Sequence, residues 1–103
     1  MPAPRSHPLV KVDLEEAYDW LEEEEPGLGD RFLADFLSTH RRLRVGPRHF
    51  SVRFAGIHRL NLTHFRYGIF YVIVGSEIRV LGVLHAARRH RQLLAGRRRS
   101  FAG

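Results

Sequence analysis

The chain has 103 residues, of which 44% are hydrophobic and 11% aromatic, and its formal net charge is +6. This length corresponds to one domain over residues 1–103, and the composition is globular rather than disordered. The absence of cysteine excludes disulfides and thiolate metal sites, and no apolar run reaches the ~20 residues of a membrane span. We therefore expect a cytoplasmic protein without a cofactor or a bound metal.

Two helices are predicted near the start of the chain. Asp13 and Glu16 have the spacing of a capping box, and the apolar residues that follow predict a helix that ends at Pro26-Gly27. A second helix is predicted over residues 29–45, with Gly46-Pro47 as its end signal. We expect these two helices to form an α-hairpin.

From residue 50 onward the hydrophobic period changes to two, which is typical of strands. Strands are predicted over residues 51–54, 57–65, 67–74 and 77–85, with a tight turn at Gly75-Ser76. Residues 7–12 are ambiguous and could add a short edge strand, although the prolines around them remove backbone donors. The predicted fold class is α+β, with an N-terminal α-hairpin packed on a mainly antiparallel sheet of about four strands.

The C-terminal segment is rich in arginine and alanine. We expect one short helix around residues 89–95, followed by a loose basic tail from about residue 96. The arginines of this tail (residues 97–99) are predicted to be solvated.

The charges are divided along the chain. Residues 1–35 hold ten acidic residues against three basic ones, a net of −7, and residues 36–103 hold fourteen arginines against Glu77, a net of +13. Such a field attracts nucleic acid or an acidic protein partner, and arginine suits both phosphate and carboxylate. The alternative is an ordinary solvated surface whose arginines reflect the codon usage of a GC-rich genome.

The candidate site consists of basic residues on the predicted sheet. The sequence contains no HExxH motif, no glycine-rich phosphate loop and no nucleophile elbow. We predict a cationic pocket in which Arg59 and Arg88 hold a phosphate and His85 transfers a proton, since imidazole titrates near neutral pH. The structural alternative is that His85 caps the end of its strand and Arg88 pairs with an acid of the first helix. The predicted contacts to nucleic acid or another target are Asn61, Thr63, Arg79, Arg89 and Arg91.

Several segments together resemble the RelE/ParE family of bacterial toxins. Residues 13–20 (DLEEAYDW) and 26–32 (PGLGDRF) resemble its first two helices, and residues 57–71 resemble its arginine strand and aromatic hairpin. Residues 80–88 resemble its last strand and His-x-x-Arg ending. The resemblance covers about residues 9–91. The chain departs from the family pattern in having Arg66 where a proline is usual and His58 where a second arginine is common.

The resemblance implies the toxin of a type II toxin–antitoxin system, which arrests growth and is neutralised by a cognate antitoxin wrapped around it. Two mechanisms are implied by the family: metal-independent mRNA cleavage on the ribosome, and non-enzymatic inhibition of DNA gyrase through the basic C-terminal segment. The ribonuclease members carry a tyrosine or histidine close to the C-terminus, and this chain has no tyrosine beyond Tyr71. An inactive plasmid-stabilisation relic and a nucleic-acid-binding module without catalysis are the alternatives.

Overall fold

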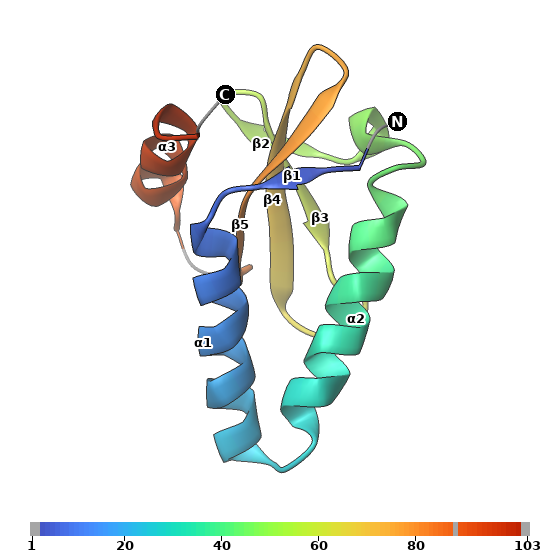
Figure 1. The fold of residues 1–103 in the computed structure, drawn as a ribbon, viewed down its shortest axis with the longest axis vertical. Coiled ribbons are helices and arrows are strands. Elements are labelled where there is room, and N and C mark those ends of the chain that lie inside the picture. The colour runs from blue at the N-terminus through green and yellow to red at the C-terminus, as the bar shows by residue number, and fades with distance from the viewer. Residues whose placement is uncertain (1–2, 88, 102–103) are drawn as a thin grey trace.

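The computed structural model describes residues 3–87 and 89–101. In this part of the chain an α-hairpin covers one face of a five-stranded sheet, and a short C-terminal helix packs on the other (Figure 1). The elements are β1 (Arg5–Ser6), α1 (Leu9–Glu24), α2 (Leu28–Arg42), the 3-10 turn η1 (Pro47–His49), β2 (Val52–Phe54), β3 (Ile57–Asn61), β4 (Tyr67–Val74), β5 (Glu77–His85) and α3 (Arg91–Arg99). The predicted α+β fold is confirmed.

The sheet has the strand order β1-β5-β4-β3-β2, and the β1–β5 pair alone is parallel. The bounds of β4 and β5 agree with the prediction, and Gly75 takes a positive φ of 62° in the turn between them. β3 ends at Asn61 rather than at Phe65. The reason is that the carboxylate of Asp35 on α2 accepts the backbone N–H groups of Thr63 and His64, at 3.1 and 2.7 Å, and holds them in a loop.

The start of the chain differs from the prediction. The capping box at Asp13 is wrong, because α1 begins at Leu9, and a strand over residues 7–12 is excluded by the same helix. Pro8 stands at the N-cap, where the fixed φ of proline suits a helix start. The edge strand is instead Arg5–Ser6, which pairs with β5. Asp13 lies inside α1 on its buried face.

The C-terminal segment is more ordered than predicted. A loose tail from about residue 96 is wrong, because α3 continues to Arg99, and Leu94 and Arg97 on it are buried. The apolar side chain of Leu94 packs on the sheet, and Arg97 forms an ion pair with Asp13. Two long-range contacts therefore hold a segment whose own sequence is highly charged.

Buried side chains form one cluster on each side of the sheet. The cluster under α1 and α2, on what we call the hairpin face, contains Val10, Ala17, Leu21, Phe32, Phe36, Leu43, Leu60, Leu62, Ile69, Tyr71, Ile78, Val80 and Val83. The cluster on the other side, which we call the α3 face, contains Ile57, Phe70, Val72, Leu81 and Leu94. This alternation along the strands assigns each side chain to a face.

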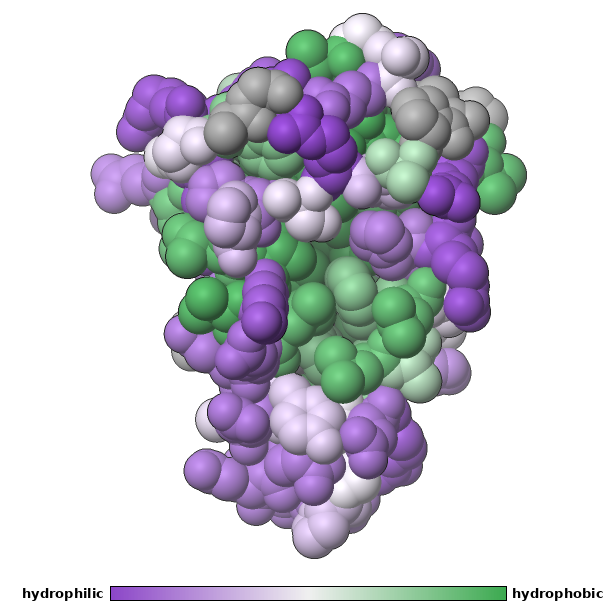
Figure 2. Space-filling view, viewed as in Figure 1, coloured by the Kyte–Doolittle hydropathy of each residue, from purple (hydrophilic) through white to green (hydrophobic). Residues whose placement is uncertain are grey.

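The α-hairpin is not closed along its whole length. In Figure 1, α1 and α2 meet at their connecting loop and diverge toward the sheet. Figure 2, seen from the same side, shows apolar side chains gathered in a hollow between the two helices, below β1, while the surface around the connecting loop is hydrophilic. No helix in the described residues is long and apolar enough to span a membrane.

Candidate functional site

The predicted cationic pocket is divided by the sheet. Arg59 on β3 is paired across the ladder with Phe70, whose ring belongs to the cluster on the α3 face. The ring of His85, at the end of β5, lies 5.3 Å from that of Tyr67, which packs on Phe32 of α2. Arg59 and His85 therefore lie on opposite faces, and Arg88 lies outside the described residues.

A single-residue bulge in β5 explains this separation. Tyr71 pairs with Val80 and Phe70 pairs with Gly82, so Leu81 is the extra residue. Strict alternation would place His85 on the same face as Leu81, the α3 face, because both numbers are odd. The extra residue reverses the parity after residue 81, as a one-residue shift of register must, and moves His85 to the hairpin face.

Arg59 is a partly desolvated cation without a carboxylate partner in the described chain. Its side chain crosses over Gly68, where a Cβ atom would lie 2.9 Å from Arg59 Cγ and Cδ. The guanidinium Nη1 lies 3.4 Å from the carbonyl oxygen of Ala86, and Nε is buried without a hydrogen-bond partner. Burial, and then the nearby charge of Arg53, lower the pKa of Arg59. Such a group favours the approach of an anion.

His85 lies in a cleft with a different character. The cleft, of about 520 Å³, separates α1 from the end of β5 and is lined by Asp13, Glu16, Ala17, Trp20, Tyr67, Val83, Leu84, His85, Ala87 and His90. The Nδ1 atom of His85 accepts the backbone N–H of Ala87 at 3.2 Å, which leaves Nε2 as the protonated nitrogen of the neutral ring. None of the lining residues within residues 3–87 and 89–101 is a lysine or an arginine.

Two of the predicted contacts, Asn61 and Thr63, lie at and just after the end of β3. Asn61 is exposed at the end of β3, and its Oδ1 would lie 3.4 Å from a Cβ placed at Gly68, which is where the Arg59 side chain also passes. Thr63 is exposed in the loop that Asp35 holds. Of these two, only Asn61 shares the surroundings of Arg59.

The remaining predicted contacts are spread over the C-terminal half. Arg79 on β5 is not free, because its Nε pairs with Glu77 at 2.5 Å and its guanidinium lies over the ring of Phe101. Arg89 is exposed in the loop before α3. Arg91, in the first turn of α3, lies over the ring of Phe54 at 4.6 Å.

Two further arginines complete a basic surface: Arg98, which belongs to the predicted basic tail, and Arg53, which the sequence analysis did not single out. Arg98 on α3 donates to the carbonyl oxygen of Ala55 in the β2–β3 turn at 2.5 Å, and Arg53 on β2 is close enough to Arg59 to affect its pKa. We call the set of Arg53, Arg59, Arg91 and Arg98 the basic face. None of the four has a carboxylate partner in the described residues.

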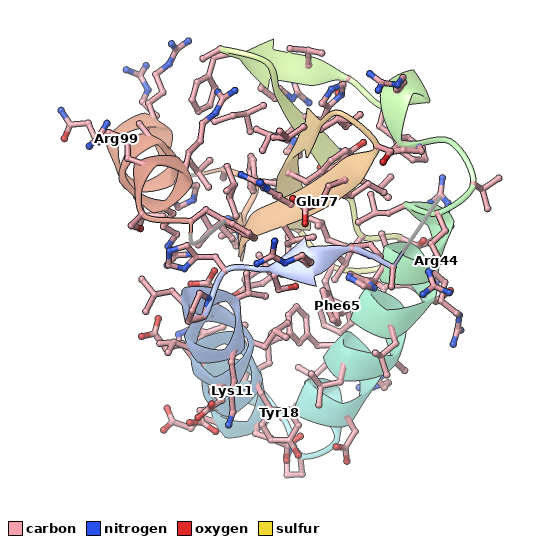
Figure 3. All side chains as sticks on the ribbon, turned by 45° about the horizontal axis from the view of Figure 1, so that its top comes forward. Lys11, Tyr18, Arg44, Phe65, Glu77 and Arg99 are labelled. Carbon is pink, nitrogen blue, oxygen red and sulfur yellow. The ribbon has the colours of Figure 1, made fainter. Side chains whose placement is uncertain are left out.

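The basic face has a defined place in the molecule. It lies where α3 meets β2 and β3, on the side opposite to the cluster of the α-hairpin. In Figure 3, Arg99 extends outward from α3, whereas Arg44 lies at the end of α2 on the other side of the molecule. No sequence motif marks this surface, because its residues come from three elements. No group of three His, Asp or Glu side chains within residues 3–87 and 89–101 is arranged to hold a metal ion.

Comparison with known proteins identifies the family. A family model described as the ParE toxin of the type II toxin–antitoxin system parDE matches residues 5–90. A solved structure titled "Chromosomal ParDE TA system from P. aeruginosa" shares the fold, with a TM-score of 0.73 at 18% identity, covering 82% of this chain and 96% of that one. No curated protein matches the sequence. Because the family model spans most of the chain, the protein belongs to the ParE toxin family of type II toxin–antitoxin systems.

Proposed function

We propose that this toxin arrests growth by binding its target through the basic face, without catalysis, and that the target is DNA gyrase. The observation that carries the proposal is the position of Arg59 and His85 on opposite faces of the sheet. RNA cleavage needs a cation at the scissile phosphate and a proton-transfer group within hydrogen-bond reach of the same phosphodiester. The Arg59 guanidinium reaches Ala86 at the end of β5 from the α3 face, whereas His85 faces the α-hairpin, and this arrangement favours binding over catalysis.

The composition of the basic face fits a binding role. Its four guanidinium groups lack carboxylate partners among the described residues, and Arg91 is held over the ring of Phe54. Arginines held in this way lose little conformational entropy on binding and suit bidentate contacts to carboxylate or phosphate. DNA gyrase with bound DNA presents carboxylates from the protein and phosphates from the DNA.

The binding proposal is tested with purified protein in a gyrase supercoiling assay, beside an mRNA-cleavage assay in a translation extract. Arg98→Ala should weaken supercoiling inhibition about tenfold, as expected for a charge-assisted hydrogen bond. Arg44→Ala removes the same charge from an exposed position far from the basic face and is the matched control. If both substitutions weakened inhibition equally, the cause would be the net charge of the protein, and the proposed role of the basic face would be wrong.

Messenger RNA cleavage is the second candidate, favoured by the packing of His85 on Tyr67 in the cleft beside α1. It predicts cleavage products in the extract that disappear in His85→Gln, with no effect of the native protein on supercoiling. That result would overturn the gyrase proposal. A native protein that produces neither effect and does not arrest growth on induction would be the inactive relic.

We also propose that a cognate antitoxin neutralises the toxin by occupying the hollow between α1 and α2. The hollow exposes apolar side chains (Figure 2), and Phe65 lies between the two helices in Figure 3. An acidic antitoxin would in addition compensate the positive charge of residues 36–103. Its affinity should fall as salt rises above physiological strength, where the Debye length is below ~8 Å. Co-purification with the product of the neighbouring gene, repeated at rising salt, measures both expectations.

A further inference from the structure

Helix α3 is fastened to the rest of the molecule by a buried ion pair. Arg97 on α3 and Asp13 on α1 are 84 residues apart, and two nitrogens of Arg97 meet the two carboxylate oxygens of Asp13, at 2.5 Å from Nη1 to Oδ2 and 2.9 Å from Nη2 to Oδ1. Only 10% of the Arg97 side chain and 5% of the Asp13 side chain are exposed. A two-point contact of this type fixes the direction of the side chain as well as its distance.

The ion pair also occupies the edge of β5 where β1 ends. The last backbone bond at this edge runs from the N–H of His7, directly after β1, to the carbonyl oxygen of Val80. The next backbone groups along this edge of β5 are bonded by side chains. Arg97 Nη1 donates to the carbonyl oxygen of Leu81 at 3.1 Å, and Asp13 Oδ2 accepts the N–H of Val83 at 3.0 Å. The Asp13–Arg97 ion pair therefore bonds the backbone groups of β5 that a neighbouring strand would otherwise bond beside the bulge.

Gly82 provides the space for this arrangement. A Cβ atom at Gly82 would lie 3.0 Å from Arg97 Nη1 and 3.3 Å from Leu94 Cδ2. The guanidinium and the apolar side chain of α3 therefore both approach the strand at a position without a side chain. A Cβ here would require these neighbours to move by a few tenths of an ångström, and we expect a β-branched side chain to disturb the packing of α3 further.

A buried ion pair gives little net stability compared with an apolar pair of the same shape, because both charges lose their hydration. Here the Nε atom of Arg97 is also buried without a hydrogen-bond partner, which adds a cost. What the pair supplies is orientation. Arg91 and Arg98 are seven residues apart, two helical turns, so the rotation of α3 set by Arg97 decides whether both reach β2 and the β2–β3 turn.

We propose that Asp13 and Arg97 are positioning residues, which hold α3 in the rotation that completes the basic face. The proposal rests on the proposed function, because it assumes that the basic face contacts the target. It assigns Arg97 a role different from that of its neighbours Arg98 and Arg99, although the three are adjacent in sequence and carry the same charge.

The first test compares Arg97→Met with Arg99→Met, an exposed site on the same helix. Both substitutions remove one positive charge. Arg97→Met should speed hydrogen exchange of the α3 amides at least tenfold and weaken supercoiling inhibition, per folded molecule, about tenfold. Arg99→Met should leave α3 exchange unchanged. Normal inhibition by folded Arg97→Met protein with a loosened α3 would overturn the proposal.

A second variant removes the effect of charge and guards against failure to fold. Gly82→Val keeps Asp13 and Arg97 and the net charge, but adds a branched side chain whose Cβ would lie 3.0 Å from the Arg97 guanidinium. It should speed α3 exchange and weaken inhibition as Arg97→Met does. Fast exchange with full inhibition in this variant would show that the rotation of α3 is irrelevant to target binding, and the proposal would fail.

Failure of the proposed function gives a different pattern. If the native protein does not inhibit supercoiling, DNA gyrase is the wrong target. The positioning role is then judged by growth arrest on induction, in strains producing equal amounts of folded native protein, Arg97→Met, Gly82→Val and Arg99→Met. Loss of arrest in the first two variants alone supports positioning, and equal arrest in all four contradicts it.

Discussion

The two faces of the sheet bury apolar side chains in different ways. The hairpin face is covered by α1 and α2, of 16 and 15 residues, which pack on a continuous apolar cluster. The α3 face is covered by one helix of nine residues that contributes Leu94 to a smaller cluster bordered by arginines. We therefore expect the hairpin face to supply most of the stability, whereas the α3 face leaves cations accessible.

The largest difference between the faces should appear when each loses one fully buried side chain. Phe32→Ala on the hairpin face should lower the free energy of unfolding by about 3–5 kcal/mol, because the ring packs on Phe65 and Tyr67 and leaves a cavity. Leu94→Ala should cost about 2 kcal/mol, the lower end of the range for a buried leucine, because we expect α3 to open before the rest of the fold. Urea unfolding measures the loss, and hydrogen exchange should show a global effect for the first and an effect limited to α3 for the second. If both variants lost the same free energy of unfolding and both showed a global effect on exchange, the proposed difference between the two faces would be contradicted.

A polar contact on the hairpin face provides the next comparison. Asp35→Asn should lower the free energy of unfolding by about 1.5–3 kcal/mol, because its buried carboxylate accepts the N–H groups of Thr63 and His64. Asp19→Asn changes an exposed carboxylate on α1 and should stay within ~0.5 kcal/mol. The measurement is the urea midpoint at pH 7. A cost at Asp35 no larger than at Asp19 would mean that the loop after β3 does not depend on this carboxylate.

The α3 face should show its own pH dependence through His7. The ring is buried, its Nδ1 accepts the N–H of Leu9 and its Nε2 lies 3.0 Å from Ser100 Oγ. Burial, and then the charge of Arg97, lower the pKa of His7, so the folded state disfavours the protonated ring. The resulting stability is fully present above about pH 6.5, the range of a free histidine, and is lost as pH falls through the lower folded pKa.

His7→Gln should therefore lose less stability than the native protein between pH 7.5 and pH 5. His64→Gln, at an exposed position, is the matched control and should follow the native curve. His40 contributes in the same direction in all three proteins, because burial and then Arg44 lower its pKa. Thermal unfolding across this range measures the difference, and parallel curves for native and His7→Gln proteins would contradict the expectation.

The smallest effect on stability is expected at Arg59. The Nε atom of Arg59 is buried without a hydrogen-bond partner, and burying a charged group in this way opposes folding. Arg59→Met should therefore leave the free energy of unfolding unchanged or raise it by about 0.5 kcal/mol. The same variant should lose target inhibition, because it removes the central cation of the basic face. Urea unfolding and the supercoiling assay on one protein sample measure both effects. A destabilised variant with full activity would assign Arg59 a structural role.

Much of the fold followed from the sequence because it depends on local pattern. Hydrophobic spacing and the Pro26-Gly27 signal predicted the α-hairpin, with α2 ending at Arg42 rather than Val45. Period-two alternation gave β4 and β5 with their bounds, and Gly75 marked the turn. These features need only neighbouring residues, since a helix or hairpin forms from groups within a few positions of one another.

The site and the chain ends were decided by tertiary contacts. A charged residue is normally solvated, so the sequence alone favoured Asp13 as a cap and Arg97 as part of a loose tail, whereas each provides the partner that allows the other to be buried. One extra residue at Leu81 moved His85 to the face opposite Arg59. The sequence determined which residues are apolar, basic or turn-forming, and long-range pairing and strand register decided which of them meet.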